Sequence, residues 1–131
     1  MIKYALLMVE DQILTAASLE ASLTKAGFEV SVAHGGAEAL EQIDGDTAHF
    51  DALVTDIGLG NGPDGWEVGH RARDRFPGIP VVYASFGNER QWPVEGVEGS
   101  LYVGKPYRAS QIVSAVSSLL DTIGWGEARP M

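Results

Sequence analysis

A chain of 131 residues is the size of a single domain, and its 45% hydrophobic and 21% charged residues are ordinary for a globular protein. The net charge of −9, with no basic cluster, argues against direct binding to nucleic acid or to an anionic membrane surface, because both depend on Lys and Arg. The absence of cysteine excludes disulfides, thiolate nucleophiles and cysteine-ligated zinc.

The first nine residues are mostly apolar, but they do not form a signal peptide. The apolar run is short, ends at Glu10-Asp11, and is not followed by the small residues of a cleavage site. No window of the sequence approaches the length of a transmembrane helix. We therefore expect a cytoplasmic protein.

Short apolar runs predict five strands, at residues 4–9, 30–32, 52–56, 79–84 and 101–103. Amphipathic stretches follow the first three strands and the fifth, and Asp64 is the predicted N-cap of the third. Their apolar residues at helical spacing are Ala16, Leu19, Leu23 and Ala26; Ala39, Leu40 and Ile43; Trp66, Val68, Ala72 and Phe76; and Ile112, Val116, Leu119, Leu120 and Ile123. This alternation predicts an α/β fold with a parallel sheet and right-handed crossovers.

The segment between the fourth and fifth strands has the weakest helical pattern. Residues 88–91 offer about one turn before the first of three residues that disfavour a helix, which are Pro93, Gly96 and Gly99. We therefore expect residues 87–100 to be mostly a loop, which could reorder cheaply. One or more of three apolar residues should hold it to the sheet: Trp92, Val94 and Val97.

Polar residues follow the predicted strands at their carboxyl ends: Glu10-Asp11, Asp56, Ser85 and Lys105. In a parallel sheet these ends share one edge, so the side chains can converge. Crowded carboxylates repel unless a cation neutralises them, and an all-oxygen site suits Mg²⁺. A carboxylate can also attack phosphorus, with the lysine and the metal neutralising the transferred group. Each residue alone also has a bland interpretation, as a turn cap or a surface residue.

The order and spacing of Glu10-Asp11, Asp56, Ser85 and Lys105-Pro106 resemble the CheY-like receiver domain of response regulators, from residue 3 to about residue 120. The resemblance implies a three-layer, flavodoxin-like (βα)₅ sandwich with the parallel strand order 2-1-3-4-5, here with a short or irregular fourth helix. It also implies a function in two-component phosphorelay signalling. A histidine kinase or phosphotransfer protein would supply a phosphoryl group, and enzymatic activity would be limited to the domain's own phosphorylation and dephosphorylation.

The resemblance assigns the residues of a phosphoryl-transfer site. Asp56 is the phosphoacceptor, and Lys105, in a bond to proline that is commonly cis in the family, pairs with the phosphoryl oxygens. The cofactor is Mg²⁺, held by Asp56, directly by Asp11, and through a water by Glu10. The backbone carbonyl of Gly58 is a further expected ligand.

The resemblance also assigns a switch. Ser85 donates its hydroxyl to the phosphoryl group, and Tyr102 occupies the aromatic switch position, where the ring fills the space that the hydroxyl vacates. Phe86 stands where the family usually has Ala or Gly, so its ring is expected to obstruct access to the acceptor. Gly58 and Gly87 lack the side chains that often help or hinder the hydrolytic water.

The expected domain covers residues 1–123, with a flexible C-terminal tail at 124–131. It is expected to be a stand-alone receiver that signals through contacts with an unknown downstream protein, and a homodimer is left open. One alternative is a pseudo-receiver adaptor that is never phosphorylated, which Phe86 motivates. A flavodoxin-like FMN-binding protein is a third hypothesis, disfavoured because the loop ends are acidic rather than rich in Ser, Thr and Gly.

Overall fold

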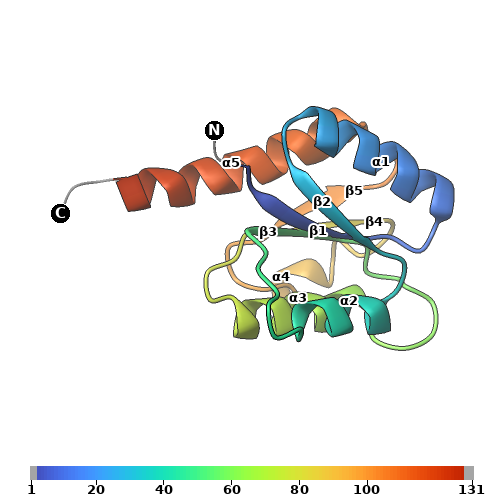
Figure 1. Cartoon of the computed structure of the whole chain (residues 1–131). Coiled ribbons are helices and arrows are strands. Elements are labelled where there is room, and N and C mark those ends of the chain that lie inside the picture. The colour runs from blue at the N-terminus through green and yellow to red at the C-terminus, as the bar shows by residue number, and fades with distance from the viewer. Residues whose placement is uncertain (1–2, 129–131) are drawn as a thin grey trace.

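The structure is a computed structural model that describes residues 3–128, and strands alternate with helices throughout (Figure 1). The elements are β1 Ala5–Val9, α1 Ile13–Lys25, β2 Glu29–Ala33, α2 Gly36–Ile43, β3 Ala52–Thr55, α3 Gly65–Arg75, β4 Val81–Ser85, α4 Trp92–Glu95, β5 Leu101–Gly104 and α5 Ala109–Ala128. All strand pairs are parallel, in the order β2-β1-β3-β4-β5. The predicted three-layer, flavodoxin-like fold is confirmed.

Helices cover both faces of the sheet, as Figure 1 shows, with α1 and α5 on one face and α2, α3 and α4 on the other. Alternate residues of β1 enter the two cores: Leu6 and Met8 pack with α1 and α5, and Leu7 and Val9 pack with α2 and α3. Because both faces are covered, the central strands are continuous apolar runs. The register of these strands therefore fixes the positions of the polar residues that follow the strands.

The predicted cap of α3 is confirmed. The Asp64 side chain accepts a hydrogen bond from the backbone N–H of Glu67 at 2.9 Å. Val68 and Ala72 of α3 are buried against the sheet, as the helical spacing predicts. The helix ends at Arg75, before Pro77.

The fourth helix is short, as predicted, but its position differs from the expected one. Residues 88–91 form a hydrogen-bonded turn, and the one-turn helix α4 follows at Trp92–Glu95. Pro93 lies inside its first turn, where a missing N–H breaks no helical bond. Two of the three apolar residues predicted to hold the segment pack against the core: Val97, which is only 6% exposed, and Trp92. The third, Val94, is 81% exposed.

Helix α5 continues to Ala128. The predicted domain boundary at 123 thus falls inside this helix, and the last part of the predicted tail, 129–131, lies outside the described residues. The boundary and the flexibility of the tail stay predictions. Among residues 3–128, no helix combines the length and apolar content needed to cross a membrane.

Candidate functional site

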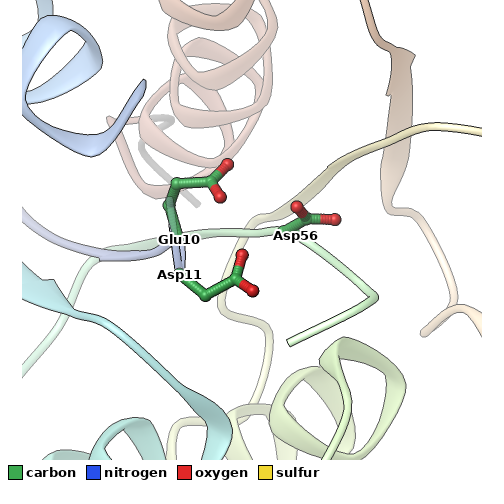
Figure 2. Close-up of side chains that lie close together, drawn as sticks. All are labelled: Glu10, Asp11 and Asp56. Atoms are coloured by element: carbon green, nitrogen blue, oxygen red, sulfur yellow. The ribbon is translucent and has the colours of Figure 1, made fainter. Parts of the chain in front are cut away.

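Three carboxylates meet where β1 and β3 end. The backbone N–H of Asp56 donates to the carbonyl of Val9 at 2.9 Å, so the pairing of the strands sets Asp56 beside Glu10 and Asp11. One carboxylate oxygen from each lies within 4.8 Å of the others (Figure 2). Glu10 is 3% exposed and Asp56 9%, whereas Asp11 is open to solvent. Asp56 lies 45 positions after Asp11 in the sequence, and the parallel pairing of β1 with β3 brings it beside Glu10 and Asp11.

Lys105, directly after β5, completes the group. Its backbone N–H donates to the carbonyl of Ser85 at 2.8 Å, which fixes it against the end of β4. Its ammonium donates to Asp56 Oδ2 at 2.7 Å and to Glu10 Oε1 at 2.8 Å. The Lys105–Pro106 peptide bond is cis, as the resemblance implies. The structure thus brings together the predicted acidic residues and the predicted lysine.

Burial and charge pairing act against each other in this group. Burial raises the pKa of Glu10 above its ordinary value, although hydrogen bonds from Lys105 and the backbone of Gln12 oppose that rise. Burial acts to lower the pKa of the Lys105 ammonium, but the hydrogen bonds to Asp56 and Glu10 outweigh it, so this pKa is raised well above its usual range. Lys105 therefore stays charged at any physiological pH.

The donor set fits a hard divalent cation. Three carboxylates against one ammonium leave a surplus of two negative charges if all are ionised. Both oxygens of Glu10 are engaged, one by Lys105 and one by the N–H of Gln12 at 3.0 Å. Asp11 is exposed, and among the described residues no hydrogen bond reaches its carboxylate. Asp11 is therefore the carboxylate most available for direct coordination, with oxygen ligands of the kind Mg²⁺ prefers.

The loop after β3 closes on itself beside the acceptor. The N–H of Gly65, the first residue of α3, donates to the carbonyl of Ile57 at 2.8 Å. A Cβ at Gly65 would lie 2.0 Å from the carbonyl oxygen of Asp56, so only glycine allows this approach. Gly58 lies in the exposed part of this loop, and its carbonyl as a metal ligand stays a prediction.

Ser85 and Tyr102 are in contact at the other side of the site. Ser85 is buried at the end of β4, and its hydroxyl donates to Asn88 Oδ1 at 2.9 Å. The Tyr102 hydroxyl donates to the Ser85 carbonyl and accepts from the N–H of Asn88, both at 3.1 Å. Sequence reasoning missed Asn88. Its only signal is an amide side chain three residues after a strand end, where Asn commonly bonds a nearby turn.

Phe86 flanks the site on the side of α1. Its side chain is 76% exposed and lines a pocket of about 540 Å³ together with Leu14, Lys105 and Pro106. The pocket lies between the start of α1 and the loop before α5. Its effect on access to Asp56 stays a prediction.

Comparison with known proteins agrees with this geometry. A model of the response regulator receiver domain family matches residues 6–117. Transcriptional activator protein IrlR of Burkholderia pseudomallei is 33% identical over 126 residues, which cover 95% of this chain and 52% of that protein. Response regulator MprA of Mycobacterium ulcerans is 31% identical over 117 residues, 88% of this chain and 49% of that protein. The chain thus spans about half the length of these curated relatives.

A solved structure agrees as well. The crystal structure of a response regulator receiver protein from Sinorhizobium medicae superposes with a TM-score of 0.87 at 36% identity. The match covers 91% of this chain and 95% of that one. The similarity therefore extends over most of the chain.

Proposed function

The chain belongs to the response regulator receiver domain family, and from that premise we propose that it is a phosphoacceptor that takes a phosphoryl group onto Asp56 with Mg²⁺. The donor is a histidine kinase or a phosphotransfer protein, and the output passes through contacts with a downstream protein. One observation carries the proposal: Lys105 bonds Asp56 and Glu10 within a cluster of three carboxylates. Because membership of this family accounts for the flavodoxin-like fold, the hypothesis of an FMN-binding protein is no longer needed.

The chemistry follows from the arrangement of the side chains. A carboxylate oxygen of Asp56 attacks phosphorus and forms a P–O bond, while the P–N bond to the donor histidine breaks and its electron pair stays on the imidazole nitrogen. Lys105, already 2.7 Å from Asp56 Oδ2, is placed to meet the negative phosphoryl oxygens. Bound Mg²⁺, held by Asp11, Asp56 and Glu10, would supply further positive charge to the same oxygens.

Intact mass tests the proposal directly. After incubation with Mg²⁺ and acetyl phosphate, the protein should carry one phosphoryl adduct, and Asp56→Asn should carry none. Asp51→Asn is the matched control, because Asp51 lies near the opposite end of the same strand and bonds the N–H of Ala5. An adduct that persists in Asp56→Asn, or one lost in Asp51→Asn, would contradict the assignment of the acceptor.

The pseudo-receiver adaptor has no observation in its favour among residues 3–128. The three carboxylates lie together, and Lys105 contacts two of them, Glu10 and Asp56. Phe86, which motivated that alternative, is exposed at the rim of a pocket. A cytoplasmic location and the absence of direct nucleic-acid or membrane contact belong to the same proposal.

A further inference from the structure

Three residues beside the acceptor form a closed ring of hydrogen bonds. Ser85 donates its hydroxyl to the side-chain oxygen of Asn88 at 2.9 Å, and Asn88 donates its backbone N–H to the Tyr102 hydroxyl at 3.1 Å. Tyr102 closes the ring by donating to the Ser85 carbonyl at 3.1 Å. Asn88 therefore contacts both residues of the expected switch, one through its side chain and one through its backbone.

The Ser85 hydroxyl has a single proton to donate. While Ser85 donates that proton to Asn88 Oδ1, it cannot donate it to a phosphoryl oxygen, so the two acceptors exclude each other. Ser85 is buried, so water does not readily replace either acceptor. The state of this one hydroxyl therefore depends on how strongly Asn88 holds it.

Asn88 also leads into the α4 segment. Its carbonyl accepts the backbone N–H groups of Gln91 and Trp92, both at 3.2 Å, which fixes the turn before α4. The Trp92 ring lies 6.1 Å from the Tyr102 ring, centroid to centroid. A change at the Ser85 hydroxyl can thus reach Trp92 through Asn88 and Tyr102.

We propose that Asn88 is a positioning residue for phosphoryl transfer, whose side-chain oxygen competes with the phosphoryl group for the Ser85 hydroxyl. This inference rests on the proposed function. In the unmodified protein the bond to Asn88 keeps Ser85 turned to the α4 segment. When a phosphoryl group arrives, the Ser85 hydroxyl must leave Asn88, and the ring loses the one hydrogen bond that links the Ser85 and Asn88 side chains.

Beryllofluoride, bound with Mg²⁺ as a mimic of the phosphoryl group, measures this competition. Its affinity is followed by ¹⁹F NMR of protein labelled with 5-fluorotryptophan, with the Trp92 resonance assigned by Trp92→Phe. Asn88→Ala should bind about twofold to tenfold more tightly than the parent, the range expected from one net hydrogen bond. Asn88→Leu keeps the size of the side chain without its oxygen and should behave alike.

A double-mutant cycle separates competition from a general loosening of the loop. In the Ser85→Ala background the gain from Asn88→Ala should vanish, because no hydroxyl remains to be released. Arg90→Ala, at an exposed neighbouring position, should leave the affinity unchanged in both backgrounds. An Asn88→Ala protein with unchanged or weaker affinity, or with an equal gain in both backgrounds, would overturn the role of Asn88 alone. A parent protein that fails to bind beryllofluoride would overturn the proposed function and this inference with it.

Discussion

The segments that follow β3 and β4 both lead from a strand end of the site to a helix, but they are held in different ways. The loop after β3 closes through its own backbone, from Gly65 to Ile57, and enters an 11-residue helix capped by Asp64. The segment after β4 forms a four-residue helix without a side-chain cap.

Side chains from other elements hold that second segment. His70 and Arg73 of α3 donate to the carbonyls of Glu95 and Glu98, both at 2.8 Å. The buried Tyr83 hydroxyl of β4 accepts the N–H of Val97 at 3.2 Å. The geometry of this segment therefore depends on residues distant in sequence, and substitutions far from it should loosen it. The geometry of the acidic site should be much less sensitive to such distant substitutions.

Among the substitutions that separate the two regions, Gly69→Ala should have the largest effect on stability. A Cβ at Gly69 would lie 2.2 Å from the Tyr83 hydroxyl, and the Tyr83 side chain is fully buried. We expect a loss of about 2–3 kcal/mol in the free energy of unfolding, as for an overpacked core. Urea denaturation measures the loss, and hydrogen exchange should become faster at the Val97 amide.

Gly58→Ala is the matched control for Gly69→Ala. A Cβ at Gly58 meets no atom within 4 Å, so the free energy of unfolding should change by less than about 0.5 kcal/mol. If Gly69→Ala were as stable as this control, with Val97 still protected, Tyr83 would not be the residue that fixes the segment.

Lys105→Met should have a smaller effect and act on the other region. It leaves Glu10 and Asp56 buried without their cation, at a cost of about 1–2 kcal/mol, limited because Glu10 can take up a proton. Millimolar Mg²⁺ should stabilise this variant more than the parent, because the metal replaces the missing charge.

Lys25→Met, at an exposed lysine in the last turn of α1, is the control for Lys105→Met and should cost no more than about 0.5 kcal/mol. In the Lys105→Met variant, hydrogen exchange in residues 88–100 should be as slow as in the parent protein. Faster exchange there would show that the two regions are not independent.

Trp92→Phe should cost about 1 kcal/mol, the net value of one hydrogen bond. It keeps an aromatic ring beside Tyr102 but removes the indole N–H that donates to the Ser100 hydroxyl at 2.9 Å. Val94→Ser nearby should be neutral because Val94 is exposed. Thermal melts of both variants check the difference, and equal melting temperatures would remove Trp92 from the contacts that hold the segment.

The smallest effect appears only at alkaline pH. Burial raises the pKa of the Tyr83 hydroxyl above its ordinary value of 10.0, although the hydrogen bond from Val97 opposes the rise. The folded protein therefore holds this proton more tightly than the unfolded chain. Its contribution is fully present below pH 10 and is lost as the pH rises through the higher folded value. Between pH 9 and 10.5, unfolding free energies should fall more for the parent than for Tyr83→Phe, and equal falls would contradict the raised pKa.

The fold and the site were largely predictable because both depend on local pattern. Alternating apolar runs and amphipathic helices define a parallel sheet, and residues such as Asp56 and Lys105 directly follow strands, so the topology places them together. The position of α4 differs from the predicted one because proline disfavours a helix interior but is tolerated in the first turn, where Pro93 lies.

The hydrogen bonds that hold α4 could not be read from the sequence. Tyr83 meets Gly69 and Val97, each 14 residues away, and only the packing of α3 on β4 brings them together. Asn88 was missed for a related reason: an asparagine in a loop has many partners within reach, and the tertiary structure selects Ser85.

The closed loop after β3 has a consequence for protein engineering. Its two ends are joined by the hydrogen bond between Ile57 and Gly65, and Leu59 between them is buried in the core, so extra residues at the exposed tip should leave the position of Asp56 unchanged. Gly60 and Gly62, both exposed and with positive φ, lie at its tip. A circularly permuted fluorescent protein inserted at Asn61 would be attached a few residues from the acceptor while leaving the strands and α3 intact, which makes this loop the natural graft point for a biosensor.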